Sequence, residues 1–196
     1  MMERPFGGRD AMANYIIIGC KQLGLEIFSV RDGEMTLQLD RKIMRKLWDC
    51  YYVPTVKGYF GSFGRFRSDD AKTGDIIALV GSTAGTTYFP DQVNMEDGAS
   101  YAIECTMLSV PTFAGGEGAI VQQGAGMVVT KSDESTEYAA TAFLKWVTEA
   151  QRNIGFSVSS GYLPVKNEAN QLDKILPALE SVENGSAKEL LKKCLR

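Results

Sequence analysis

The stretch Ser160-Gly161-Tyr162-Leu163-Pro164-Val165 carries the strongest fold signal in this sequence, together with the segment that leads to it. Gly161 allows backbone angles closed to other residues, whereas Pro164 fixes its own φ and favours extended geometry at Leu163. The turn should therefore hold Tyr162 on a stiff, non-helical element. Its ring and hydroxyl suit a ligand that is part apolar and part polar, although a turn tyrosine can equally pack on the core.

A glycine-containing segment and a helix precede this turn. Gln122, Gln123 and Gly124 interrupt apolar runs, and buried amides need partners, either from a ligand or from neighbouring backbone. The run from Met127 to Val129 predicts a short buried strand. Ser132 is expected to cap a helix. Apolar residues at helical spacing predict that one side of this helix faces the core: Ala139, Ala140, Phe143, Trp146 and Val147.

Local signals also organise the N-terminal part of the chain. Residues 10–23 have the apolar spacing of a helix, and Gly24 suits its C-terminal cap. The segments 26–30 and 35–39 predict two strands. The intervening Asp32-Gly33 is a strong signal for a hairpin turn.

Shorter elements are expected further on. Asp40 should cap a helix that ends before Pro54, and Ser68 should cap a short helix closed by Gly74. The other predicted elements are a strand over 76–80, a short helix beginning at Ser82 and Thr83, a strand over 101–108 and mostly helix over 167–196. Helices mixed with short strands indicate an α/β fold.

Composition excludes several classes of function. The 196 residues are 44% hydrophobic, enough for one sizeable core or two small ones. A net charge of −3 does not favour nucleic-acid binding, and the single basic and aromatic cluster around Arg65 and Arg67 is weak evidence for it. Histidine is absent, and the four cysteines lack metal-ligand spacing. We therefore expect no metal, no cofactor and no catalytic residues.

Four motifs occur in an order and spacing that are specific together, although each is weak alone. They are Gly74-Asp75-Ile76-Ile77-Ala78-Leu79-Val80-Gly81-Ser82-Thr83-Ala84-Gly85, Gln123-Gly124-Ala125-Gly126-Met127-Val128-Val129-Thr130, Ala142-Phe143-Leu144-Lys145-Trp146 and Gly161-Tyr162-Leu163-Pro164-Val165. The segment 74–165 resembles the C-terminal half of a sugar-type extracellular (periplasmic) substrate-binding protein of an ABC transporter. The residues from Gly7-Gly8-Arg9-Asp10 onward also fit this family, less distinctively.

The resemblance implies a fold of the periplasmic-binding-protein type II kind, with two lobes joined by a hinge. Residues 1–109 would belong to lobe two, 110–150 to the hinge crossover and the remaining part of lobe one, and 151–196 to a C-terminal helical return to lobe two. Family members are longer and begin with a signal peptide, whereas residues 1–9 lack an apolar stretch. The chain is thus expected to be a C-terminal fragment with lobe one incomplete, from a protein that is extracellular, periplasmic or lipid-anchored at the cell surface.

Candidate ligand-binding residues follow from the motifs. Ser82 and Thr83 join a strand to a helix start, where hydroxyls and backbone N–H groups can hold oxygen atoms, although simple capping explains them equally well. The resemblance implies that this turn touches ligand. It also implies that Gln123 and Gly124 contact ligand from the crossover strand and that Tyr162 does so from the third loop. Arg9 and Asp10 would contact ligand from the start of lobe two. At the last position Gly8 and Arg9 replace the family's usual aromatic residue, which weakens that assignment.

The function implied is capture of a sugar or sugar-like solute by hinge closure, without covalent chemistry, and delivery to the permease subunits of an ABC transporter. Two alternatives are a carbohydrate-active enzyme that uses a carboxylate pair and a ligand sensor for a signalling receptor. Because lobe one would lack some of its strands, unpaired strand edges should also favour self-association of this chain.

Overall fold

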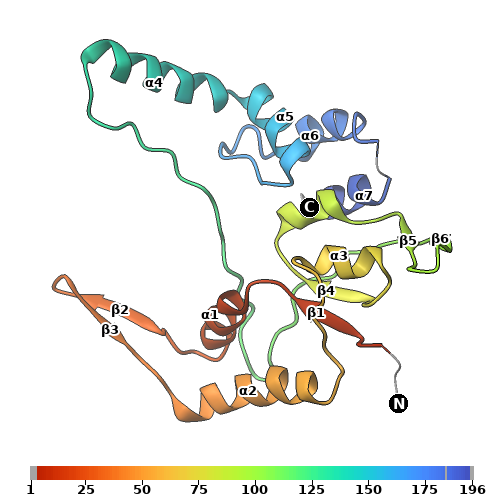
Figure 1. Ribbon diagram of the computed structural model, residues 1–196. Helices are drawn as coiled ribbons and strands as arrows, with labels where there is room; N and C mark the ends of the chain where they lie inside the picture. Colours follow the sequence, from red (N-terminus) through yellow and green to blue (C-terminus); the bar gives the residue numbers. More distant parts are fainter. Residues whose placement is uncertain (1–3, 184, 195–196) are drawn as a thin grey trace. The chain divides into compact units, whose positions relative to one another are not determined.

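The computed structural model describes residues 4–183 and 185–194 (Figure 1). The chain forms two compact units. The N-terminal unit contains residues 4–81, 93–101 and 108–122, and the C-terminal unit contains residues 82–92, 102–107, 123–183 and 185–194. Both helices and strands are present, which agrees with the expected α/β class. None of the described helices is long and apolar enough to cross a membrane.

A parallel strand pair lies in the N-terminal unit. Strand β1 (Gly7–Arg9) pairs with β4 (Ala78–Val80), so that Gly7 lies opposite Ala78 and Arg9 opposite Val80. A side chain at Gly7 would place its Cβ 2.6 Å from the Ala78 carbonyl oxygen, so the close approach requires glycine. The strand predicted over 76–80 is confirmed in its last three residues.

The predicted N-terminal helix and hairpin are both confirmed. Helix α1 (Met12–Gln22) is followed by β2 (Phe28–Arg31) and β3 (Glu34–Leu37), which pair antiparallel. Asp32 and Gly33 have φ values of 53° and 81°. Positive φ at both central residues is the requirement of a two-residue hairpin turn that matches strand twist.

Helix α2 (Arg41–Val56) begins where the sequence predicts but ends later. The Asp40 carboxylate accepts hydrogen bonds from the backbone N–H groups of Lys42 and Ile43, at 2.8 and 2.9 Å. The helix contains Pro54, so the prediction that it ends before this residue is wrong. Proline in the last turn costs only one helical hydrogen bond, and the turn continues with Lys57 N–H donating to the Val53 carbonyl.

Helix α3 (Arg67–Lys72) is closed near Gly74, as predicted, but Ser68 does not cap it. The N-cap residue is Phe66, whose backbone N–H donates to the Asp69 carboxylate at 3.2 Å. Ser68 lies inside the helix and is buried. The cap is supplied by the Asp69 carboxylate, which reaches back to the backbone before the helix, and a search for capping hydroxyls misses it.

A buried glutamine connects α1 to the distant segment 108–122. The Gln22 side-chain amide donates to the carbonyls of Pro111 and Ala119, at 3.3 and 3.1 Å, and its oxygen accepts from the N–H of Phe113 at 3.1 Å. The Phe113 ring also lies 6.1 Å from that of Tyr15, centroid to centroid. One side chain thus replaces the strand pairing that this irregular segment lacks.

The strand predicted over 101–108 forms only in part. Strands β5 (Gln92–Asn94) and β6 (Ser100–Ala102) make a two-stranded sheet, and no helix or strand is present over 103–133. The buried strand predicted at 127–129 is therefore wrong: Met127 and Val128 are exposed. An apolar run becomes a strand only if a neighbouring strand accepts its backbone hydrogen bonds, and no strand of the described chain pairs with this one.

The C-terminal unit is helical. It contains the 3₁₀ helix η1 (Thr83–Tyr88), α4 (Glu134–Val147), α5 (Ala150–Ser160), α6 (Leu172–Leu179) and α7 (Gly185–Cys194). The predicted helix start at Ser82 and the helical C-terminal region are confirmed. Buried apolar residues of its core come from α5, the following turn, α6 and α7: Ile154, Val158, Ala169, Ile175, Leu179 and Leu191.

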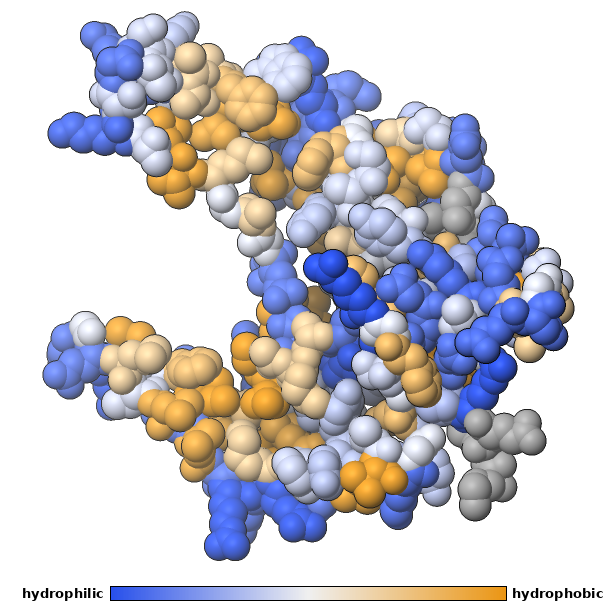
Figure 2. All heavy atoms as spheres, in the orientation of Figure 1, coloured by the Kyte–Doolittle hydropathy of each residue, from blue (hydrophilic) through white to orange (hydrophobic). Residues whose placement is uncertain are grey.

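Helix α4 corrects two predictions. Its N-cap is Asp133, which accepts a hydrogen bond from Thr136 N–H at 3.0 Å, rather than Ser132. None of its residues is buried: on the expected core-facing side Phe143 and Trp146 are exposed, and Ala140 and Val147 are only part-buried. Figure 2 shows apolar surface over this helix. Periodicity identified the helix, whereas burial depends on a neighbouring element that the described chain does not supply.

Replacement of Gln22 tests its role in holding the segment 108–122 within the N-terminal unit. Gln22→Leu should lower the free energy of unfolding by about 1–3 kcal/mol, because part-buried backbone groups on the 108–122 segment lose their hydrogen-bond partners. Urea unfolding followed by circular dichroism measures the change. Gln38→Leu, on the exposed surface beside β3, is the matched control and should change little; an equal effect of the two replacements would contradict the role of Gln22.

Candidate functional site

The turn that carries Tyr162 is fixed at both ends. Gly161 caps α5 with φ 73°, and its N–H donates to the Ser157 carbonyl at 2.9 Å. Four residues later, the Val165 N–H donates to the buried side-chain oxygen of Asn153 at 2.8 Å. These contacts keep the intervening residues out of helix, and the Tyr162 side chain is 45% exposed. The stiff, solvent-facing aromatic predicted from the sequence is present.

Gly161 also joins this turn to η1. A Cβ built on Gly161 would lie 2.8 Å from the Ala84 Cα and 2.9 Å from the Thr83 carbonyl oxygen. The two backbones therefore touch, which places the Tyr162 turn beside the turn that holds Ser82 and Thr83. The structure thus brings three of the predicted ligand-binding residues into one region of the C-terminal unit.

The hydroxyl-bearing turn has the capping role, which is one of the two roles considered for it. Ser82 is the N-cap of η1, and its Oγ accepts a hydrogen bond from Ala84 N–H at 3.3 Å. The Thr83 carbonyl accepts from the Thr86 hydroxyl at 2.7 Å. Ser82 and Thr83 are both exposed, so solvent reaches the same side chains that shape the helix start. Capping fixes these residues in position and still leaves this surface open to a ligand.

Gln123 and Gly124 lie on the exposed segment without helix or strand. A Cβ at Gly124 would have no heavy atom within 4 Å, so open space surrounds this backbone. The crossover strand expected here is not formed. Both residues belong to the C-terminal unit, as does Tyr162, but no strand ladder positions them.

Arg9 and Asp10 belong to the N-terminal unit, at the end of β1. The Arg9 guanidinium lies over the Tyr15 ring, 5.0 Å from its centroid, and burial lowers the pKa of Arg9. Burial, as the largest cause, raises the pKa of Tyr15 to about 12, and the Tyr15 hydroxyl donates to the Leu47 carbonyl at 2.7 Å. Arg9 is therefore held as a cation against an aromatic face rather than extended into solvent.

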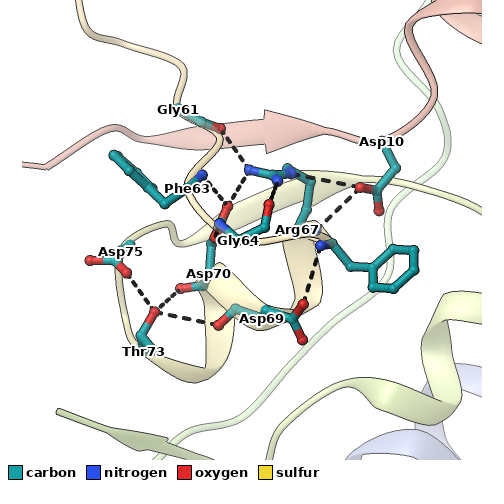
Figure 3. A network of polar contacts seen from close by, with 10 residues as sticks. Asp10, Gly61, Phe63, Gly64, Arg67, Asp69, Asp70, Thr73 and Asp75 are labelled. Carbon is teal, nitrogen blue, oxygen red and sulfur yellow. Dashed lines mark hydrogen bonds and ion pairs between the residues drawn. The ribbon is translucent and has the colours of Figure 1, made fainter. Parts of the chain in front are cut away.

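Asp10 is part of a buried charge network that the sequence did not reveal (Figure 3). One oxygen of its carboxylate accepts from the Arg67 backbone N–H at 3.2 Å and lies 3.6 Å from the Arg67 Nε. The side chains of Arg67 and Asp70, only 3% and 2% exposed, form a direct ion pair. The other oxygen of Asp10 lies beside Gly81, since a Cβ there would be 3.4 Å away.

The same network also fixes the loop before α3. Arg67 donates to the carbonyl of Gly64 at 2.6 Å, and the Asp70 carboxylate accepts from the N–H groups of Phe63 and Gly64 at 3.2 and 2.6 Å. The i, i+3 spacing of Arg67 and Asp70 on a helix was the available signal. From the sequence, Arg67 was interpreted only as part of a basic and aromatic cluster. Arg67 instead orients Asp10.

The described residues contain no group of three His, Cys, Asp or Glu side chains that could hold a metal ion. The predicted positions offer a half-exposed aromatic ring and two hydroxyls in the C-terminal unit, and an oriented carboxylate and a stacked guanidinium in the N-terminal unit. Such groups can contribute ring stacking and hydrogen bonds to a bound solute.

Comparison with known families now identifies the class of protein. The family model described as "Bacterial extracellular solute-binding protein" matches residues 10–181, most of the chain. The chain belongs to this family. The match supports an extracellular solute-binding role in transport, in a family that is not generally enzymatic. A search of curated proteins finds no match.

Removal of Arg67 tests the buried network. Arg67→Met should lower the free energy of unfolding by about 3–5 kcal/mol, because Asp70 would be buried without its partner. The double variant Arg67→Met/Asp70→Leu should recover most of this loss, as measured by urea unfolding. Arg45→Met, at an exposed ion pair with Asp49, is the control and should have little effect. A double variant no more stable than the single one would contradict the assignment.

The close contact at Gly161 can be tested with alanine. Gly161→Ala should destabilise the chain by roughly 1–3 kcal/mol, because the new Cβ meets η1 and the positive φ disfavours it. Gly155→Ala, inside α5 with no heavy atom within 4 Å of the new Cβ, should instead stabilise by about 0.5–1 kcal/mol. Thermal unfolding of both variants measures the difference, and equal melting temperatures would refute the contact.

Proposed function

We propose that this protein captures a sugar or sugar-like solute outside the cell and delivers it to the permease subunits of an ABC transporter. The observation that carries the proposal is the fixed turn of Tyr162 beside the hydroxyls of Ser82 and Thr83. A sugar has apolar C–H faces and a rim of hydroxyls. A tyrosine ring can cover the first, while serine and threonine hydroxyls can bond to the second.

The proposed mechanism is closure of two lobes about a hinge, in a fold of the periplasmic-binding-protein type II kind. Residues 1–109 and 151–196 would contribute lobe two, and 110–150 the crossover with part of lobe one. Closure would follow from the higher affinity of ligand for the closed state, without covalent chemistry. Gln123 and Gly124 would reach ligand from the crossover segment. Asp10 of lobe two, held by Arg67, would accept a hydrogen bond from a ligand hydroxyl.

The presence of many exposed apolar side chains agrees with an incomplete lobe one. Met127, Val128 and Phe143 all belong to the part assigned to that lobe, and all are exposed. In the proposed protein, further polypeptide would cover them and complete the second wall of the cleft. A lipid anchor, or confinement to the periplasm, would keep the whole receptor near its permease.

A ligand screen tests the proposal. Mono- and oligosaccharides should raise the melting temperature of the protein, and peptides and polyamines should not. For the best sugar, Tyr162→Ala should weaken the Kd roughly tenfold, about 1.4 kcal/mol, through loss of the ring contact. Titration calorimetry measures the change.

Tyr138→Ala is the matched control, because this tyrosine is exposed on α4 and outside the proposed site. Unchanged affinity in Tyr162→Ala would make the turn structural only. A response to peptides or polyamines without any response to sugars would refute the solute class. Turnover of glycosides by the purified protein would instead favour a carbohydrate-active enzyme.

A further inference from the structure

The hairpin of β2 and β3 has one apolar side, which no element of the described chain covers. Two cross-strand pairs form this side, Phe28 with Leu37 and Val30 with Met35. These four side chains are between 48% and 69% exposed, and Leu39, just beyond β3, is 63% exposed. Apolar side chains gathered on one side of an exposed sheet mark an interaction surface.

The other side of the hairpin is polar. The hydroxyls of Ser29 and Thr36, which lie opposite each other, share a hydrogen bond of 2.8 Å, and the Gln38 side-chain amide donates to the Ser29 hydroxyl at 3.1 Å. Exposed charges lie at the turn: Arg31, Asp32 and Glu34. The hairpin could therefore bury its apolar side only by lying along an apolar surface, with its turn left in water.

Helix α2, which begins three residues after β3, carries cations where they oppose the helix dipole. Its first six residues include four of them: Arg41, Lys42, Arg45 and Lys46. Positive charge near a helix N-terminus is unfavourable, and the first turn contains no acid to offset it. Arg45 pairs with Asp49 at 2.9 Å, whereas no described carboxylate pairs with Arg41 or Lys42. With Asp49 as its single acid, α2 has a net charge of +3 in a chain of net charge −3.

The outer side of α2 adds aromatic rings to these charges. The rings of Trp48 and Tyr52, both about half exposed, are stacked with their centroids 4.1 Å apart, whereas Leu47 is buried. One hollow on the outer side is lined by Arg41, Met44, Arg45 and Trp48. Tryptophan and tyrosine, which combine an apolar ring with a polar edge, are enriched where a bilayer meets water.

The apolar hairpin and the cationic start of α2 adjoin on the surface. Figure 2 shows apolar surface over the hairpin and hydrophilic surface beside it at the start of this helix. We propose that the N-terminal unit binds the surface of an anionic lipid bilayer. The apolar side of the hairpin would enter the boundary between headgroups and acyl chains, and the outer side of α2 would contact lipid phosphates. This proposal does not depend on the identity of the transported solute.

The combination of charge and apolar surface favours a bilayer over other anionic partners. A soluble phosphate or a nucleic acid would pair with the cations of α2 but would gain nothing from exposed Val30, Met35 and Leu37. A neutral apolar partner would cover the hairpin and leave Arg41 and Lys42 without anions. An anionic bilayer presents phosphates and acyl chains at adjacent depths, so it complements both parts of the surface.

Vesicle binding by the intact chain tests the role of the charges. Vesicles of phosphatidylcholine with phosphatidylglycerol should sediment with the native protein, less so as salt is added, and pure phosphatidylcholine should bind little. Arg41→Gln/Lys42→Gln should lower the partition coefficient roughly tenfold or more, because each cation near an anionic surface favours binding.

The matched control is Lys166→Gln/Lys174→Gln, which makes the same change of net charge at exposed positions in the C-terminal unit. This variant should bind as the native chain does. Equal binding of the native chain to both kinds of vesicle, or equal loss in the two variants, would overturn the proposal. Binding of DNA or inorganic phosphate without binding of vesicles would overturn it as well.

Replacement of the exposed pair Val30 and Met35 tests the apolar side. Val30→Ser/Met35→Ser should weaken vesicle binding roughly tenfold, because less apolar area enters the boundary. Ile77→Ser/Leu108→Ser removes exposed apolar side chains elsewhere in the same unit and should leave binding unchanged. Circular dichroism checks that both variants keep the native secondary structure. The same affinity in both variants would contradict a role for the hairpin.

Tryptophan fluorescence locates the contact without disturbing the hairpin. The chain has two tryptophans, Trp48 and Trp146, so each can be observed alone. In Trp146→Phe, phosphatidylglycerol vesicles should shift the Trp48 emission to shorter wavelength, and lipids brominated on their acyl chains should quench it. In Trp48→Phe, the emission of Trp146 on α4 should not change. A response of Trp146 alone, or of neither ring, would show that this surface does not bind the bilayer.

Discussion

The contact between the backbone of Gly161 and that of η1 is the constraint on which the candidate site depends. Because no Cβ fits there, α5 can end directly against Thr83 and Ala84. The Asn153 side chain then holds the far end of the turn at Val165. An aromatic ring and two hydroxyls are thereby presented from separate parts of the sequence without a sheet beneath them. Preorganisation of this kind lowers the entropy lost when a ligand binds.

In the N-terminal unit, buried polar side chains form the hydrogen bonds to backbone groups that a larger sheet would otherwise provide. Gln22 satisfies backbone groups of the segment 111–119, and the Arg67–Asp70 pair satisfies those of the loop at Phe63 and Gly64. Each replaces ladder hydrogen bonds with side-chain ones. Since the Arg67–Asp70 pair also orients Asp10, the element that stabilises the loop is the one that prepares a candidate ligand contact.

The predictions that succeeded rest on interactions within a few residues of chain. The Asp32-Gly33 turn, the Asp40 cap and the helix start at Ser82 each depend on neighbouring backbone and one local side chain. Pro54 shows the limit of such rules, because a proline in the last helical turn removes a single hydrogen bond, a cost that the surrounding structure can absorb. The strand expected at 127–129 failed because a strand needs a partner, whatever its own composition.

The sequence alone therefore determined the helices, the hairpin, the stiff turn of Tyr162 and, through four ordered motifs, a solute-binding family. Only the tertiary structure decided that Gly161 joins this turn to Ser82 and Thr83, that Arg67 holds Asp10, and that Phe143 and Trp146 stay exposed. The reason is physical: backbone propensity and capping act over a few residues, whereas burial and ion pairing depend on which distant segments meet. Distant segments meet through shape and hydrogen bonding that no local pattern encodes.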